Sequence, residues 1–241
     1  MKLEIGYNTD FEVRTAQYIT RGDFSFSVLY LSDFHFNGFS AKMVQHLSDK
    51  IDQINPDVLL LGGDYVDTKR GFLYLNKFLQ GFAIRKHVFA IAGNHDYFYG
   101  IKKIKAAFQR TNIHWIEQSS VTFQLNNQTL QIDGNLPQNR KEHVDFSILC
   151  LHQPIDLDAC QNQYQLAFAG HLHGSQFVFW QVGPKLYPGR LFFRWNILQT
   201  QIGHCHYYIS KGLGDTLPIR YNCKKDIIFI EITANAQNPV L

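Results

Sequence analysis

Five short polar motifs each follow an apolar run of the chain. They contain residues that bind metals or move protons: Asp33, His35, Asp64, Asn94, His95, Asp96, His152, His171 and His173. Side chains alternate along an extended chain, so the members of Asp-x-His and of His-x-His lie on one face. Two carboxylates, four imidazoles and an amide oxygen suit Mn²⁺, Fe²⁺ or Zn²⁺ better than they suit Ca²⁺, which prefers oxygen ligands alone. These residues are enough to hold two divalent cations that share one carboxylate.

Each motif also has an ordinary structural explanation when it is taken alone. Asp33 and His35 could cap or turn the chain, Asp64 could belong to an Asp-containing turn, and His152 could be a buried histidine. The five motifs occur together, however, each at the point where a buried strand should stop. This coincidence of position favours a shared chemical site.

The elements that must position these residues are short strands separated by helices. Apolar runs of four to eight residues are typical of strands that are buried on both faces; they are FSVLYL, DVLLL, HVFAIA, FSILC and LAFA. Helices are predicted over Ser40–Ile54, Gly71–Gln80 and Ile101–Gln109. The alternation predicts a layered α/β sheet, in which ligands gather outside the carboxyl ends of the strands.

The remaining segments predict further β structure. SVTFQL and QTLQI flank Asn126-Asn127, which is a hairpin signal. Residues 134–144 are polar and rich in turn formers, which predicts a surface loop. Near the end of the chain, DIIFIEI predicts a closing strand.

Length and composition exclude several classes of protein. The 241 residues predict a single domain over 1–241, and a net charge of +3 without basic blocks gives no nucleic-acid footprint. Cys150, Cys160, Cys205 and Cys223 form no Cys-x-x-Cys pair, which indicates reduced thiols. No signal peptide and no apolar run long enough to span a membrane is visible. We therefore expect a cytoplasmic protein with at most peripheral contact at the inner face of a membrane.

The ordered motifs resemble the calcineurin-like metallophosphoesterase superfamily. The resemblance covers roughly residues 29–174 and rests on Asp-x-His, Gly-Asp, Gly-Asn-His-Asp, an isolated His and Gly-His-x-His-Gly. It implies an α/β fold, a four-layer αββα sandwich of two mixed sheets flanked by helices. It also implies a hydrolase that cleaves a phosphoester or pyrophosphate bond by in-line attack, with two metal ions that are manganese, iron or zinc.

The same resemblance assigns roles to individual residues. One metal would be held by Asp33, His35, Asp64 and His173, and the second by Asp64, Asn94, His152 and His171. Asp64 would bridge the two ions. His95 would face the substrate as a general acid or charge stabiliser, and Asp96 would orient the His95 imidazole.

Closer features resemble a bacterial branch that contains small YkuE-like phosphoesterases and a type of UDP-2,3-diacylglucosamine pyrophosphatase. These features are GGDYVD, GNHDY, LHQP, GHLHGSQ and SKGLGDTLPIR. The chain departs from the pattern in the segment before His152, which is short and polar, and in KKDIIFIEI, where the branch commonly has Pro-Glu-Ile. We expect no N-terminal membrane helix of the kind that several relatives carry.

The choice of substrate stays open at this stage. Phe177–Trp195 holds seven aromatic residues among Lys185, Arg190 and Arg194, which fits either a partly buried β-meander or a lip for an acyl chain or bilayer. Lys211, Arg220 and Arg190 are candidate contacts for substrate phosphate, with exposed surface charge as the alternative. A soluble phosphodiesterase, a protein phosphatase and a metal-free scaffold that binds proteins are the competing functions.

Overall fold

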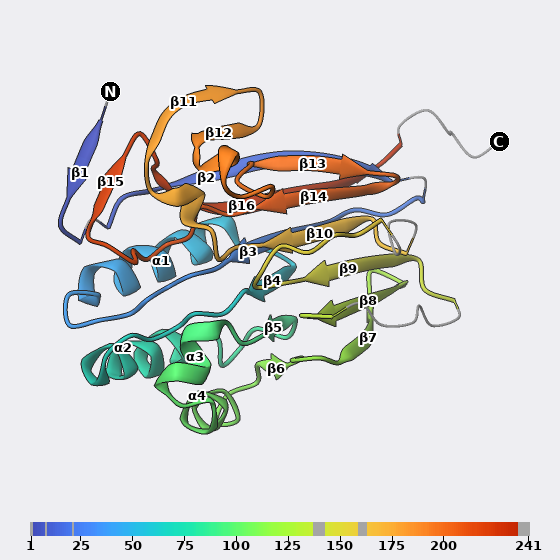
Figure 1. Ribbon diagram of the computed structural model, residues 1–241. Coiled ribbons are helices and arrows are strands. Elements are labelled where there is room, and N and C mark those ends of the chain that lie inside the picture. Colours follow the sequence, from blue (N-terminus) through green and yellow to red (C-terminus); the bar gives the residue numbers. More distant parts are fainter. Residues whose placement is uncertain (1, 8, 21, 137–142, 159–162, 236–241) are drawn as a thin grey trace.

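Two six-stranded sheets form the centre of the computed structural model, which describes residues 2–7, 9–20, 22–136, 143–158 and 163–235. In spatial order the first sheet contains β2 (Phe11–Thr20), β16 (Lys225–Ala234), β3 (Phe26–Leu31), β4 (Val58–Leu61), β5 (Val88–Ala90) and β6 (His114–Trp115). The second contains β13 (Gln199–Ile202), β14 (Cys205–Ile209), β10 (Leu166–Ala169), β9 (Phe146–Cys150), β8 (Gln128–Gly134) and β7 (Ser120–Leu125). Figure 1 shows the two sheets and the smaller elements around them.

Both sheets are mixed, as the sequence predicts. β3, β4, β5 and β6 run parallel to one another, whereas β16 pairs antiparallel with β3. In the second sheet β8, β9, β10 and β14 are parallel, and the predicted hairpin of β7 and β8 turns at Asn126 and Asn127. The parallel strands carry the polar motifs, so their carboxyl ends bring those motifs together.

Four α-helices are found in the described residues: α1 (Ala41–Ile54), α2 (Lys69–Gln80), α3 (Asn94–Tyr99) and α4 (Ile101–Phe108). Three of them match the predicted helices to within about two residues, a usual margin for helix ends. α3 was not predicted. It begins at Asn94, directly inside the Gly-Asn-His-Asp motif, and its six residues are too few to show a helical period.

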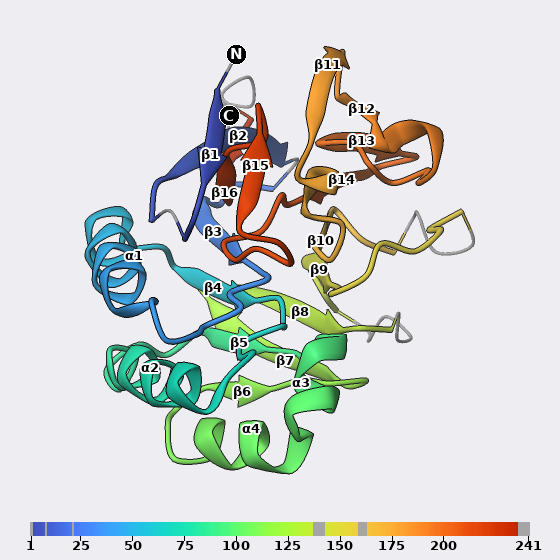
Figure 2. The ribbon, with the colours of Figure 1, turned by 60° about the vertical axis from the view of Figure 1, so that its left-hand side comes forward.

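Alternating side chains of β3 divide the apolar core into layers. Leu29 and Leu31 pack with Leu47 of α1 and Phe78 of α2, on the face away from the second sheet. Val28 and Tyr30 point the other way and pack between the sheets. Figure 2 shows α1, α2 and α4 along one side of the first sheet and the second sheet on the other.

Helices therefore cover one sheet, and the second sheet is covered differently. Among the residues that the structure describes, its outer face packs against loop side chains, including Leu157, Trp195 and Ile197. Two mixed sheets in one α/β fold are confirmed, and the described part of the fourth layer is irregular chain.

Smaller elements complete the last third of the chain. They are β1 (Leu3–Ile5) with β15 (Ile219–Tyr221), β11 (Val178–Val182) with β12 (Lys185–Pro188), and the single-turn segments η1 (His173–Ser175) and η2 (Gly189–Leu191). Cys150 and Cys223 are buried free thiols, as the sequence predicts, and Cys205 is also buried. Cys160 and residues 137–142 of the predicted surface loop lie outside the described residues.

Candidate metal centre

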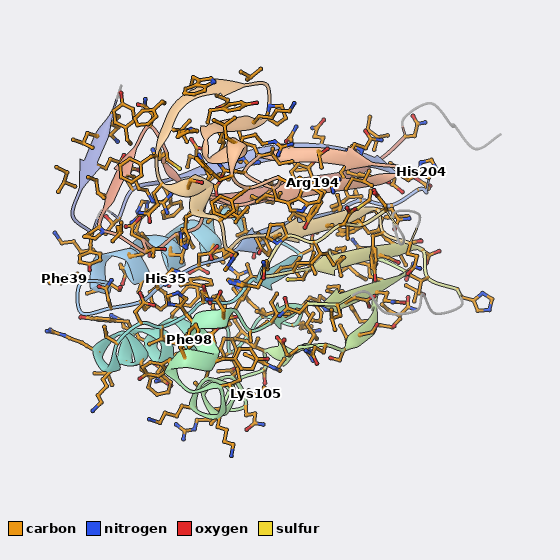
Figure 3. All side chains as sticks on the ribbon, in the orientation of Figure 1. His35, Phe39, Phe98, Lys105, Arg194 and His204 are labelled. Carbon is orange, nitrogen blue, oxygen red and sulfur yellow. The ribbon has the colours of Figure 1, made fainter. Side chains whose placement is uncertain are left out.

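The predicted ligands meet where the carboxyl ends of both sheets face each other. Asp33 and His35 follow β3, Asp64 follows β4, and Asn94 follows β5. From the second sheet, His152 follows β9, and His171 and His173 follow β10. Figure 3 labels His35 at this edge, with the exposed rings of Phe39 and Phe98 nearby.

Asp64 occupies the middle of this cluster. Its Oδ2 lies 3.7 Å from Nε2 of His35 and 3.3 Å from Nε2 of His152. Its Oδ1 accepts a hydrogen bond of 2.7 Å from the backbone N–H of His95. One carboxylate oxygen therefore faces ligands from both sheets, while the other is fixed by the chain.

A first half-site forms on one side of Asp64. Nε2 of His173 lies 3.7 Å from Oδ1 of Asp33, and the rings of His35 and His173 are 5.0 Å apart between centroids. Ligand atoms of Asp33, His35 and His173 lie within 4.8 Å of one another. We call Asp33, His35 and His173, with Asp64, the first half-site.

A second half-site forms on the other side. Nε2 of His152 lies 3.0 Å from Oδ1 of Asn94 and 3.2 Å from Nδ1 of His171. Ligand atoms of Asp64, His152 and His171 also lie within 4.8 Å of one another. We call these residues, with Asn94, the second half-site.

The donor atoms fit cations. Nδ1 of His35 is bonded to Asp67 at 2.8 Å, and its Nε2 is buried without a hydrogen-bond partner among the described residues. Nδ1 of His152 is bonded to the carbonyl of Gly62 at 2.9 Å, so its Nε2 also faces the centre. Metal-binding histidines are usually oriented through their other nitrogen in this way.

Strained backbone marks the same residues. Asp33, His35, Asp64, His171 and His173 all have positive φ angles, between 44° and 70°. Such angles are uncommon outside glycine, cost energy, and cluster at functional sites. Gly93 is needed for a different reason, because a Cβ there would collide with the Asp64 carboxylate and the His152 ring.

The charges of the cluster are coupled. Burial alone would raise the pKa of Asp64, but its hydrogen bond to His152 and the nearby imidazoles lower it to about 2. Burial alone would lower the pKa of His152, but the Asp64 carboxylate raises it to about 9. Burial, with the charges of His35 and Arg220, lowers the pKa of His173 well below its usual value.

His95 stands at the open side of the cluster. Its side chain is 36% exposed, and its Nδ1 lies 3.1 Å from Oδ1 of Asp67. The same Asp67 oxygen also bonds His35. His95 further shares a possible metal-binding group with His35 and Asp64, so geometry alone leaves it two roles.

The predicted role of Asp96 is wrong. Asp96 is buried, and its carboxylate accepts hydrogen bonds from the backbone N–H groups of Gly93, Asp64 and Tyr65 at 2.8–2.9 Å. It is the third residue of α3, and a carboxylate there turns back toward the start of its own helix. Asp96 thus shapes the Asp64 backbone, and Asp67 supports the His95 imidazole.

Two of the predicted phosphate contacts are also wrong. Arg220 is fully buried, and Lys211 is buried with its ammonium 2.6 Å from Glu12. Neither side chain is available to a substrate. The alternative prediction, that both are exposed surface charges, is wrong as well. Arg190 is half-buried on η2.

Sequence reasoning missed two supporting residues. Asp67 is the second carboxylate of GGDYVD, a motif in which the sequence analysis singled out Asp64 alone. Asn135 follows β8 at the start of the predicted surface loop; its Oδ1 accepts the His152 N–H at 2.8 Å, and its Nδ2 donates to the Ala92 carbonyl at 2.8 Å. Its position at a strand end was the available signal.

Comparisons with known proteins agree with this geometry. Residues 26–175 match the family described as Calcineurin-like phosphoesterase. Phosphodiesterase YaeI of Escherichia coli is 25% identical over 224 residues, covering 86% of this chain and 82% of YaeI. An uncharacterized metallophosphoesterase of Helicobacter pylori is 22% identical, covering 92% of this chain and 64% of that protein.

Solved structures share the fold. A putative 5'-nucleotidase from Staphylococcus aureus superposes with a TM-score of 0.53 at 12% identity, covering 90% of this chain and 56% of that one. A Thermus thermophilus protein, TT1561, gives a TM-score of 0.50 at 8% identity over 79% of this chain and 91% of that one. At these identities the likeness concerns fold alone.

Metal affinity is expected to rise with pH. At pH 7 the metal-free protein holds a proton on His152, whose pKa is about 9, and a cation must displace it. Affinity for Mn²⁺ should therefore increase by up to about tenfold per pH unit between pH 6.5 and 8.5 and level off near pH 9. Calorimetry in buffers of different ionisation enthalpy should count about one proton released. A flat affinity and no proton release would contradict this coupling.

Proposed function

The chain belongs to the calcineurin-like phosphoesterase family, and we propose that it hydrolyses a phosphoester or pyrophosphate bond with one divalent cation in each half-site. The observation that carries this proposal is the position of Asp64 Oδ2, which faces His35 Nε2 and His152 Nε2 at 3.7 and 3.3 Å. A carboxylate between two imidazole clusters can bridge two cations. Nε2 of His35 has no hydrogen-bond partner in the part of the chain that the structure describes, which supports the same arrangement.

The protein's own groups perform the positioning. Cations held by the two half-sites would lower the pKa of a bound water and would neutralise phosphoryl oxygens. Asp33 and Asp64 provide the negative charge that holds cations, and the imidazoles turn their free nitrogens toward them. His95, supported by Asp67, faces the open side, where it can donate a proton to the leaving oxygen or stabilise its charge.

We further propose manganese as the working metal, with iron and zinc as alternatives. The ligand set of imidazole, carboxylate and amide oxygen suits all three borderline cations. A metal-free protein-binding scaffold is not favoured, since all seven candidate ligand side chains lie within the two half-sites.

A lipid-linked pyrophosphate, such as a UDP-diacylglucosamine, is the finer proposal for the substrate. β11 begins five residues after His173, and the chain from Phe179 to Phe193 exposes large apolar side chains. These are Phe179, Trp180, Val182, Leu191, Phe192 and Phe193, which we call the aromatic lip. Val178 and Leu186 are buried, so the lip is anchored as well as exposed.

Charge around the lip favours an anionic lipid surface. In sequence, no aspartate or glutamate occurs between Asp158 and Asp215, and Lys185 and Arg190 lie within the lip. Arg194, beside the lip, is paired with Asp156 at 2.6 Å. Exposed aromatic residues with neighbouring cations are typical of peripheral contact with anionic membranes. No helix of the described chain has both the length and the apolar character that crossing a membrane requires.

A soluble diester is the second candidate substrate. It is favoured by the name of the relative in Escherichia coli, a phosphodiesterase, which this chain matches over 82% of that protein's length. The two candidates differ in whether the lip contributes to binding.

Replacing the shared carboxylate tests the metal centre. Wild-type protein reconstituted with Mn²⁺ should hold two equivalents by elemental analysis, and Asp64→Ala should lose both the metals and hydrolysis because each half-site loses a ligand. His46→Ala, on the exposed side of α1, is the control and should keep both. An active Asp64→Ala protein without metal would overturn the assignment.

His95→Ala separates the two roles that geometry leaves open. If His95 acts on the substrate, the variant should keep two equivalents of Mn²⁺ and lose about 10²–10⁴ in kcat, the usual range for a general acid. Elemental analysis and steady-state kinetics on the same sample make the comparison. Loss of metal together with activity would instead make His95 a ligand.

Acyl chains should raise kcat/KM if the lip receives them. Burial contributes about 0.8 kcal/mol per CH₂, so we expect at least about a tenfold preference for the acylated nucleotide sugar over its deacylated form. Phe192→Ser should reduce the preference, and Ile84→Ser, which is 93% exposed elsewhere, should not. Equal kcat/KM values for both forms would eliminate the lipid proposal and leave a soluble diester.

A further inference from the structure

The SKGLGD stretch passes directly behind the first half-site. We call Lys211–Asp215 the backing loop. Its Leu213 N–H donates to the carbonyl of Ser32 at 3.1 Å, and its Gly214 N–H donates to the carbonyl of Asp33 at 2.5 Å. The loop is therefore bonded to the backbone that carries Asp33.

Two glycines let the backing loop touch all three ligands that belong to the first half-site alone. A Cβ on Gly214 would collide with Cβ of His35. A Cβ on Gly212, where φ is +75°, would lie 2.8 Å from Cβ of Asp33 and 3.1 Å from Nδ1 of His173. No larger residue fits at either position without displacing a ligand.

Arg220 holds the backing loop in this place. Its side chain is 2% exposed. One terminal nitrogen donates to the carbonyls of Lys211 at 3.0 Å and Gly214 at 2.7 Å, which are near the two ends of the loop. Its Nε donates to Asp215 at 2.5 Å, and the other terminal nitrogen donates to the Cys223 carbonyl at 3.2 Å.

The same guanidinium reaches the metal ligand itself. The nitrogen that binds the loop carbonyls lies 3.4 Å from Nδ1 of His173. Only a planar fork with several fixed donors can make these contacts together; a lysine ammonium has one nitrogen and cannot span them. Arg220 is thus bonded to the loop, to its flanking carboxylate and to one of the ligands that the loop supports.

The second half-site is held by other parts of the chain. His152 is fixed by the Gly62 carbonyl and by Asn135, and the backbone around Asp64 is fixed by Asp96. Asn94 begins α3. Disturbing the backing loop should therefore affect one half-site and spare the other.

We propose that Arg220 is a positioning residue for the first half-site, where it locks the backing loop against Asp33, His35 and His173. This inference rests on the proposed two-metal function. It assigns a role to the SKGLGDTLPIR motif that substrate contact cannot explain, because the guanidinium is buried and its donors are engaged within the protein.

Lys225 provides a matched control. Its ammonium lies 2.7 Å from the other oxygen of Asp215, and its side chain is 3% exposed. Lys225→Met and Arg220→Gln each remove one buried cation and leave Asp215 paired with the other. Arg220 in addition donates to the Lys211 and Gly214 carbonyls and lies beside His173.

Metal stoichiometry, with the electron paramagnetic resonance spectrum of bound Mn²⁺, tests the proposal. Wild type and Lys225→Met should hold two equivalents with the signal of a coupled pair. Arg220→Gln and Arg220→Lys should hold one equivalent at full affinity, bind the second at least about tenfold more weakly, and show an uncoupled ion. Circular dichroism of each metal-free variant establishes that it is folded.

Double variants identify which half-site is lost. Arg220→Gln with His35→Ala should still bind one equivalent, because both changes act on the first half-site. Arg220→Gln with His152→Ala should bind no equivalent at full affinity. The reverse pattern, or an Arg220→Gln protein that binds two equivalents with wild-type affinity, would overturn the proposal.

A direct change in the loop covers the case in which Arg220 variants do not fold. Gly214→Ala pushes on His35 without touching the buried charges, and it should also lose one equivalent selectively. Loss of both equivalents equally in a folded Gly214→Ala protein would contradict a half-site role. If wild type takes up fewer than two equivalents, the proposed function itself fails before any variant is compared.

Discussion

Two carboxylates buried at the ends of neighbouring parallel strands are the constraint on which the rest of the structure depends. Asp33 follows β3 and Asp64 follows β4, and both are withdrawn from water. A buried carboxylate is costly unless hydrogen bonds and positive charge surround it. Backbone N–H groups from His171 and His95 supply part of that compensation. The ring of imidazoles, and the divalent cations that we propose, would supply the rest.

Much of the fold, and the meeting of most candidate ligands, could be predicted because both depend on local pattern. β3, β4, β9 and β10 are parallel strands buried on both faces, and such strands are continuous apolar runs in the sequence. Within each sheet, the carboxyl ends of parallel strands lie at the same edge, and this does not depend on the conformation of the loops. Polar residues directly after strands of the same sheet, such as Asp33 and Asp64, therefore had to meet, and the resemblance of the ordered motifs to the family grouped them with the histidines of the second sheet.

The supporting contacts could not be predicted because they depend on the path of the chain after each strand. Asp96 was assigned to His95, its neighbour in sequence, but the start of α3 at Asn94 turns that carboxylate toward the backbone. Asp67 supports His95 from a different loop. From the sequence, Arg220 was expected to contact phosphate or to be an exposed surface charge. It is 47 residues from His173 in sequence, and only the folded chain brings the two side chains together. The sequence shows that a residue is charged, but it does not show whether the folded chain buries that residue.

Each half-site draws its ligands from both sheets, and this has a mechanical meaning. In the first, Asp33 and His35 follow a strand of one sheet and His173 follows a strand of the other; in the second, Asn94 and His152 are divided in the same way. A cation bound in either place is a cross-link between the sheets, much as a disulfide would be. At a hundred times its dissociation constant, such a ligand adds about 2.7 kcal/mol to the free energy of unfolding. Metal binding would thus hold the two sheets together at the carboxyl ends of their strands. The free energy of unfolding would then rise with the concentration of free metal.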